Sequence, residues 1–355
     1  MDFILTYILP FALTLGVLIL VHELGHFTVA KLVGIRVERF SIGFPPRLVG
    51  KKLGETDYCI SAVPLGGYVK MAGMVDESMD QDGLKGEPWE FMSKPLWARF
   101  LAIFAGPAFN VLFAVLVFTV SIMSTGIERP VEPTFSIVGT VIEGQPADKL
   151  GLEEGDRIVA INGQEVTKWE EIVQIIHAHP EEEITIRWER DGKMFSGTVT
   201  PRLDKLNDVG LIGISPVTTQ RSVGFFAAIG YGFKSTYNLT ALMFKSFGML
   251  FSGEVSAKEG LAGPVRIAKM TGETAKSGLS SLVMFAALLS VNLGLINLFP
   301  IPALDGGHLV MLAVEGVIRK PLSTRVKMII QQIGLALLFA LMIFVVFNDV
   351  INILK

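Results

Sequence analysis

The sequence predicts a polytopic α-helical membrane protein with about four transmembrane helices and an inserted extracytoplasmic α+β domain. The 355-residue chain is 50% hydrophobic and only 18% charged, whereas soluble domains carry roughly 25% charged residues. Four uncharged windows reach the length of about 20 residues that a bilayer span requires, and they cover residues 3–21, 101–127, 277–304 and 328–348. The mean hydropathy of +0.52 agrees with this class. The lipid bilayer is therefore the expected surroundings of the chain.

Basic residues set the predicted orientation of these helices. Ten Lys or Arg residues lie between positions 31 and 99, and cytoplasmic loops carry such an excess. Because successive transmembrane helices alternate in direction, both termini and the long segment after the second helix are then predicted to lie on the extracytoplasmic side. The predicted parts are a first helix within 1–33, a cytoplasmic loop at 34–96, and further helices at 97–127, 277–305 and 326–348. The net charge of −3 argues against nucleic acid as a partner, because polyanion binding requires a basic surface.

The outer segment is predicted to hold a mixed domain followed by an interfacial region. β-prone runs at 136–142, 156–161, 183–188 and 194–200 surround a helix near 169–177. Asn162-Gly163 and Asp191-Gly192 are hairpin signals, since these residue types tolerate positive φ. We assign the domain to residues 132–204. The apolar stretch after residue 222 is interrupted by lysines, so region 205–276 is expected to lie at the outer membrane surface as an amphipathic segment.

The end of the first helix carries the pattern that predicts chemistry. His22, Glu23 and His26 form His-Glu-x-x-His, and on a helix positions i and i+4 share one face. The two imidazoles can bind one metal ion, Zn²⁺ by preference, while Glu23 activates its water. The pattern also occurs by chance, and a buried core histidine is the alternative. Burying a glutamate and two histidines in a membrane is costly without a function, which favours the metal site.

A third ligand is expected at the end of the third apolar window. Asp305 lies on the same predicted side as His26, and zinc would supply the counter-charge that a carboxylate needs at that depth. A helix-capping role before the glycine pair is the alternative. Pro300 and Pro302 break the helix and can line a polar cavity for substrate. His308 is not expected to bind the metal, because a catalytic zinc keeps one position open.

Other polar or β-prone residues are candidate substrate contacts. Asn110, Asn292 and Asn297 lie in apolar windows and could hydrogen-bond a substrate carbonyl or the oxyanion, although bonding between helices is the alternative. Gly67, Tyr68 and Val69 belong to a β-prone run that could pair with an unwound substrate by strand addition. From the residues alone an ordinary cytoplasmic hairpin is favoured there. The one cysteine, Cys59, excludes an internal disulfide.

These motifs, taken in order, resemble a known family. They are His22 to His26, Gly67 to Met71, Gly106-Pro107 with Asn110, Leu261 to Pro264, and Asn292 to His308. Together they resemble the bacterial site-2 proteases of the RseP (regulator of sigma-E protease) type over nearly the whole chain. The resemblance implies an intramembrane zinc metalloprotease with one zinc per chain. His22, His26 and Asp305 would be its ligands, Glu23 its general base, and Asn292 and Asn297 substrate-binding residues.

The resemblance also implies a location and partners. The loop at about 58–75 is similar to a membrane-reentrant β-loop, which strengthens the case for strand addition there. The enzyme would be a multi-pass protein of the bacterial inner membrane, with its active site near the cytoplasmic face. Its substrates would be single-pass membrane proteins, such as anti-sigma factors already cut on the outer side, or remnant signal peptides.

The outer domain is similar to a PDZ domain. Gly151-Leu152 and the run from Gly155 to Gly163 carry this resemblance. Such a domain would add a peptide to a sheet edge beside Ile137, Val138, Gly139 and Thr140. The segment has room for one such domain, whereas the enterobacterial type carries two.

Two other functions compete with proteolysis. The first is a PDZ-based membrane scaffold with a structural or non-catalytic metal site. Glu23 argues against it, because a structural site needs no general base. The second is a zinc-dependent transporter, which would need charged residues along a pathway through the membrane. In this sequence the charged and metal-binding candidates lie at one depth, so the transporter ranks last.

Overall fold

A computed structural model describes residues 3–74, 86–130, 136–204, 206–256, 260 and 262–354. A few expectations fall partly outside these ranges. They concern residues 1–2 of the first helical segment, residue 75 of the β-loop, residues 76–85 of the cytoplasmic loop, residues 132–135 of the outer domain, and residues 205, 257–259 and 261 after it. The chain divides into two compact units, Met1–Ser121 with Phe226–Lys355, and Ile122–Phe225.

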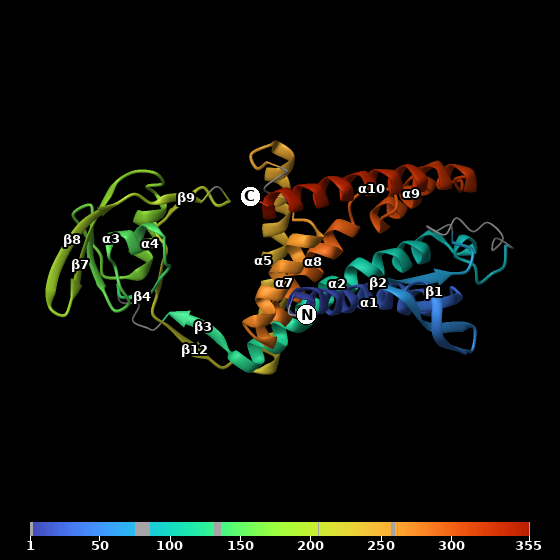
Figure 1. Cartoon of the computed structure of the whole chain (residues 1–355), viewed down its shortest axis with the longest axis horizontal. Coiled ribbons are helices and arrows are strands. Elements are labelled where there is room, and N and C mark those ends of the chain that lie inside the picture. Colours follow the sequence, from blue (N-terminus) through green and yellow to red (C-terminus); the bar gives the residue numbers. More distant parts are fainter. Residues whose placement is uncertain are drawn as a thin grey trace. The chain divides into compact units, whose positions relative to one another are not determined.

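The first unit is built mainly from helices (Figure 1). They are α1 (Leu9–Leu32) with the short π-helix η1 (Ile4–Ile8) before it, α2 (Leu96–Thr125) with η2 (Phe91–Ser93) before it, α5 (Phe225–Ser252), α7 (Pro264–Lys276), α8 (Leu279–Asn297), α9 (Asp305–Ile318) and α10 (Thr324–Leu354). Within the described ranges, four helical stretches are long and apolar enough to cross a membrane: Ile4–Leu32, Leu96–Thr125, Leu279–Asn297 and Thr324–Ile351. The predicted class of multi-pass helical membrane protein is confirmed.

The third of these helices ends earlier than the sequence suggested. We expected it to continue to Asp305, but α8 ends at Asn297 and Asp305 begins α9. The two prolines between these helices lack the N–H groups that would continue α8. The connecting segment turns at Ala303, whose φ is +71°. This turn makes Asp305 the first residue of a new helix instead of the last residue of an old one.

The segment after the second unit is one helix that packs against the bundle. In α5, Leu239, Met243 and Phe247 lie against a buried cluster from α2 and α8. An exposed aromatic stripe that includes Phe226 and Phe251 runs beside this packed face. The side away from the cluster carries the exposed Lys234, Asn238 and Lys245. The helix is therefore amphipathic, as expected, and its place at a membrane surface stays a prediction.

A β-sheet covers the carboxyl end of α1. Strands β1 (Val37–Leu53) and β2 (Thr56–Met71) are antiparallel and bend back on themselves. Ser41 consequently pairs with both Cys59 and Tyr68. The final part of β2, residues 67–71, pairs with residues 37–42 and, among the described residues, has no ladder partner on its other edge. The sheet begins at Val37, well before the β-loop that the sequence predicts at about residues 58–75.

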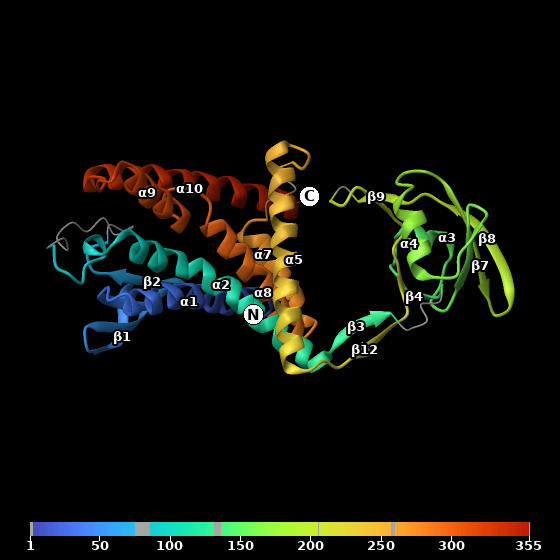
Figure 2. The ribbon, with the colours of Figure 1, turned by 180° about the vertical axis from the view of Figure 1, so that it is seen from behind.

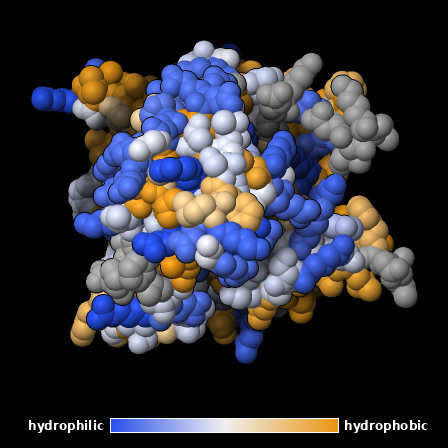
Figure 3. Space-filling model, turned by 90° about the vertical axis from the view of Figure 1, so that its left-hand side faces the viewer, coloured by the Kyte–Doolittle hydropathy of each residue, from blue (hydrophilic) through white to orange (hydrophobic). Residues whose placement is uncertain are grey.

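The second unit is a mixed α/β domain. It contains β3 (Ile127–Pro130), β4 (Val138–Val141), α3 (Pro146–Leu150), β5 (Arg157–Ile161), β6 (Gln164–Glu165), α4 (Trp169–His177), β7 (Ile184–Arg190), β8 (Lys193–Val199), β9 (Arg202–Asp204), β10 (Val209–Leu211), β11 (Ile214–Pro216) and β12 (Thr218–Arg221). β3 and β12 run side by side as an antiparallel pair, which Figure 2 shows from behind. The surface of this unit in Figure 3 is mainly hydrophilic. Both predicted hairpins are confirmed, since Asn162 and Asp191 have positive φ in the turns of β5–β6 and β7–β8.

The boundary predicted at residue 204 is too early. β11 pairs with β4, and Ile212 is buried in the same core as Val138. The chain after residue 204 therefore completes the domain, because a short strand such as β4 needs a partner to satisfy its backbone groups. The compact unit extends to Phe225.

Candidate active site

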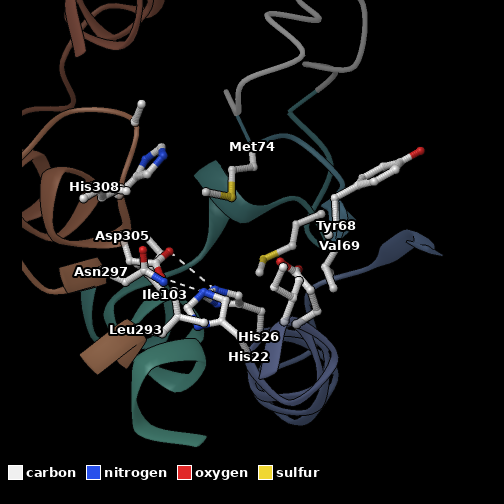
Figure 4. Close-up of a pocket in the computed structure, with 17 residues that line it drawn as sticks. His22, His26, Tyr68, Val69, Met74, Ile103, Leu293, Asn297, Asp305 and His308 are labelled. Carbon is white, nitrogen blue, oxygen red and sulfur yellow. Dashed lines mark hydrogen bonds and ion pairs between the residues drawn. The ribbon is translucent and has the colours of Figure 1, made fainter. Parts of the chain in front are cut away.

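Three predicted metal ligands meet in one buried cluster. Nε2 of His22 lies 3.1 Å from Oδ2 of Asp305 and 3.1 Å from Nε2 of His26, and Oδ1 of Asp305 lies 3.4 Å from Nε2 of His26. Potential ligand atoms of all three lie within 4.8 Å of one another. Figure 4 shows the two imidazoles and the carboxylate turned toward a common point. The residues come from α1 and from the start of α9, so Asp305 lies 279 positions after His26 in the sequence.

The outer ring nitrogens point away from this cluster. Nδ1 of His26 lies 2.9 Å from the carbonyl oxygen of Ala102, which can only accept a hydrogen bond. His26 therefore carries its proton on Nδ1 and turns an unprotonated Nε2 toward the other ligands. Such a bond from the remote nitrogen to a carbonyl is typical of histidines that bind metal.

The donor set fits a zinc ion. Two imidazole nitrogens and one carboxylate oxygen are the ligands of many catalytic zinc sites, which leave a further position for water or substrate. Oδ2 of Asp305 is buried and has no hydrogen bond of acceptable geometry among the described residues. A carboxylate oxygen in that condition is costly unless a cation compensates it. The residues present therefore suit the metal that the sequence pattern implies.

A cavity of about 380 Å³ opens beside the cluster. Glu23 lines it together with the three candidate ligands, and Asn297 lies next to Asp305 in its wall (Figure 4). The opposite wall is the end of β2, where Gly67, Tyr68 and Val69 also line the cavity. The edge of β2 that has no ladder partner among the described residues thus faces the same space as Glu23 and the candidate metal ligands.

Gly106 is a component of the site that the sequence reasoning used only as part of a motif. A Cβ atom on this residue would lie 2.6 Å from Cε1 of His26 and 2.9 Å from Cε1 of His22. A Cβ atom on Gly25, one residue before His26, would likewise overlap the backbone of Ala105. Two glycines facing each other across α1 and α2 bring the helices close together. The available signals were Gly106 inside the second apolar window and Gly25 inside the His-Glu-x-x-His pattern.

A buried ionic cluster is centred on Glu315 of α9. Glu315 accepts from Arg99 at 2.8 Å and from Lys327 at 2.7 Å, and the backbone N–H of Leu322 also donates to it. Burial alone would raise the pKa of the Glu315 carboxyl, but these donors hold the pKa below its usual value. The cluster joins α2, α9 and α10. It therefore fixes the helix that Asp305 begins.

Gln331 of α10 holds the turn before Asp305. Its Oε1 accepts from the N–H of Ala303 at 2.6 Å, and its amide Nε2 donates to Nε2 of His308 at 2.5 Å. His308 lines the cavity but is not a member of the ligand cluster. That His308 does not bind the metal stays a prediction.

Two predicted substrate contacts lie elsewhere. Asn110 is fully buried, does not line the cavity, and has its amide Nδ2 3.2 Å from Nδ1 of His22. It cannot touch a substrate without a rearrangement of α2. Asn292 also lies outside the cavity lining. Residues five apart on a helix point about 140° away from each other, so Asn297 and Asn292 cannot both face the same cavity.

The predicted peptide edge of the second unit is not free. Val138 and Thr140 pair with β11, and Ile137 forms a bridge to Arg157 on the other side. A Cβ on Gly139 would overlap the backbone of Pro216. The prediction that residues 137–140 offer an open edge is therefore wrong, because the chain beyond residue 204 returns to occupy it.

Comparison with known proteins gives matches over nearly the whole chain. Residues 10–341 match the family described as Peptidase family M50. A protein of Clostridium acetobutylicum, provisionally named a zinc metalloprotease, is 39% identical over 96% of this chain and 96% of its own length. Zinc metalloprotease RasP of Geobacillus kaustophilus is 32% identical over 97% of each chain. Among solved structures, the PDZ domain of an SdrC-like protein from Listeria monocytogenes is 24% identical over 24% of this chain and 88% of its own, with a TM-score of 0.22.

Proposed function

Because the chain belongs to peptidase family M50, we propose that it hydrolyses peptide bonds within transmembrane segments of other membrane proteins. A zinc metalloprotease activity follows from the family and from the relatives' names. The finer proposal assigns His22, His26 and Asp305 as ligands of one zinc ion per chain. The observation that carries it is the convergence of these three side chains on one point of a cavity that Glu23 also lines.

The chemical roles follow from this arrangement. A zinc ion held by the three ligands would lower the pKa of a water molecule and polarise the scissile carbonyl. Glu23 takes the proton of the attacking water and later delivers it to the leaving amine. Asn297, in the cavity wall next to Asp305, donates its amide N–H to a substrate carbonyl. Gly106 keeps the second helix close without crowding the imidazoles.

The substrate has to be unwound before it can react. A transmembrane helix satisfies all its carbonyls internally, and releasing them in lipid is costly. The open edge at residues 67–71 offers backbone groups that can pair with an extended substrate segment. We propose that strand addition at this edge compensates the hydrogen bonds lost on unwinding. The edge and Glu23 line the same cavity, which supports this step.

The orientation proposed is the one that the basic loop favours. Ten Lys or Arg residues between positions 31 and 99 would lie in the cytoplasm, with the active site near that face of a bacterial inner membrane. The second unit would be outside and act as a PDZ-type domain. Since β4 is paired on both sides, a bound peptide would add to the other edge of β11. Single-pass proteins already cut on the outer side, and remnant signal peptides, are the substrates proposed.

Glu23→Gln is the variant that tests the proposal. The full chain is reconstituted in liposomes with a single-span reporter, and cleavage is compared for wild type, Glu23→Gln and the control Glu273→Gln, whose side chain is 55% exposed on α7. Loss of a general base should lower the rate by about 10²-fold to 10⁴-fold, and the control should match wild type. A chelator should abolish cleavage, and added zinc should restore it.

The scaffold alternative makes the opposite prediction. A structural metal site would give zinc in the purified protein without any cleavage by wild type. Equal cleavage by Glu23→Gln and wild type would instead remove Glu23 from the mechanism. The intact Glu23 in the cavity lining favours the protease over the scaffold.

A further inference from the structure

Asn110 has an unusual combination of burial and incomplete hydrogen bonding. The residue is 0% exposed. Its Nδ2 lies 3.2 Å from Nδ1 of His22, while its Oδ1 is buried and has no hydrogen-bond partner in the described part of the chain. An unsatisfied buried amide oxygen is costly. The nitrogen and oxygen of a carboxamide have nearly the same shape, so the group can turn by 180° within the same space.

The two orientations of this amide select different tautomers of His22. With Nδ2 toward the ring, the amide donates to Nδ1, and the proton of a neutral imidazole must then reside on Nε2. That proton points at His26 and Asp305, which lie 3.1 Å away. With Oδ1 toward the ring, Nδ1–H donates to Asn110, and Nε2 presents a lone pair to the other two ligands. The second orientation also gives the orphaned oxygen a partner, and it moves Nδ2 to the position that Oδ1 now occupies.

We propose that Asn110 is a positioning residue of the metal site, whose amide oxygen accepts from Nδ1–H of His22 and fixes the tautomer that binds metal through Nε2. The arrangement parallels that of His26, whose Nδ1 is bonded to the carbonyl of Ala102. Both candidate histidine ligands are then oriented by α2, one by its backbone and the other by a side chain. The inference rests on the proposed function, since it assumes that His22 is a zinc ligand.

A neighbouring residue provides a matched control. The hydroxyl of Ser290 on α8 donates to the backbone carbonyl of Asn110 at 2.9 Å and is fully buried. Ser290→Ala therefore removes a buried hydrogen bond at the same helix contact and leaves the carboxamide of Asn110 in place. Any effect of general disturbance between α2 and α8 should appear in this variant as well.

The experiment measures zinc affinity instead of turnover. Full-length wild type, Asn110→Leu, Asn110→Asp and Ser290→Ala are purified, and the zinc dissociation constant of each is obtained by competition with a chelating dye. Groups that orient a ligand histidine typically contribute about 10-fold to 100-fold in metal affinity. We expect Asn110→Leu to lose that amount. Asn110→Asp, which keeps an acceptor oxygen at the same place, and Ser290→Ala should stay within about threefold of wild type.

The outcomes separate this inference from the function on which it rests. Thermal unfolding in excess chelator shows whether Asn110→Leu still folds like wild type without metal. Zinc binding by Asn110→Leu as tight as that of wild type overturns the positioning role and leaves the protease proposal standing. An equal loss in Asn110→Asp and Asn110→Leu overturns it too, because the acceptor would then be irrelevant. A wild type that binds no zinc overturns the proposed function and this inference together.

Discussion

Replacing Gly106 by alanine is the most direct test of how the site is assembled. The new Cβ would lie 2.6 Å from Cε1 of His26 and closer still to its Nε2, whereas ordinary contacts begin at 3.4 Å. The imidazole or the helix that carries it must therefore move by about 1 Å, and misplacement of that size costs about 10²-fold in rate. Rotating the ring away would relieve the overlap but would also remove Nε2 from the cluster.

The assay compares Gly106→Ala with a control, the substitution of a glycine where an added Cβ atom would contact no other residue. Gly16 lies in the same first helix as His26, and a Cβ there has nothing within 4 Å. Alanine favours a helix over glycine by about 1 kcal/mol, so Gly16→Ala should keep its activity and gain some stability. Reporter cleavage in liposomes and zinc content are measured for both variants. We expect a loss of about 10²-fold for Gly106→Ala alone.

One result would refute this reasoning. If Gly106→Ala cleaves the reporter within about threefold of wild type and retains a full complement of zinc, then His26 tolerates a displacement of about 1 Å. The close approach of α1 and α2 at this glycine would then have no part in holding the imidazoles.

Three further changes have defined outcomes. Glu315→Gln leaves buried Arg99 and Lys327 without a counter-charge, so unfolding measurements at neutral pH should show a loss of about 3–5 kcal/mol. The pKa of Glu315 is held below its ordinary 4.5, so the extra free energy of unfolding of wild type over Glu315→Gln is fully present above pH 4.5 and is lost as the pH falls through the lowered pKa. A difference in unfolding free energy between the two proteins that stays constant down to about pH 3 would contradict the ion cluster. Asn297→Ala should lower kcat/KM by about tenfold through one lost hydrogen bond. Asn292 lies outside the cavity lining, so Asn292→Ala should leave kcat/KM unchanged. Equal losses of kcat/KM in the two variants would show that the cavity is not the substrate site. A glycine introduced into the reporter helix should speed cleavage by about fivefold, since it weakens a helix by about 1 kcal/mol, and an insensitive rate would exclude unwinding before the chemical step.

Local patterns predicted much of the fold. The four membrane helices follow from the length of their apolar windows, because a bilayer imposes that length on any chain. The hairpin turns at Asn162 and Asp191 follow from residues that accept positive φ. The pairing of His22 with His26 follows from the periodicity of one helix. In each case the determining interactions lie within about 20 residues of sequence.

Predictions that depended on long-range pairing were less complete. The edge at residues 137–140 is occupied by β11, some 75 residues later, and no local pattern records that return. Asn110 was expected to face substrate, but its contact is His22 on another helix. The rotation of a transmembrane helix about its axis is set by its packing partners, so an apolar window alone does not say which polar side chain faces the cavity.

Sequence patterns were enough to predict the class of protein, the metal-binding pattern on the first helix, Asp305 as a third ligand and the family to which the chain belongs. The geometry of the site, and the contacts of Gly106 and Asn110 with the histidines, required the tertiary structure. Only the folded chain brings Asp305 to the two histidines, places Gly106 against their rings and turns Asn110 toward His22. The physical reason is that ligand geometry is fixed by contacts between helices far apart in the sequence, and those contacts depend on close packing.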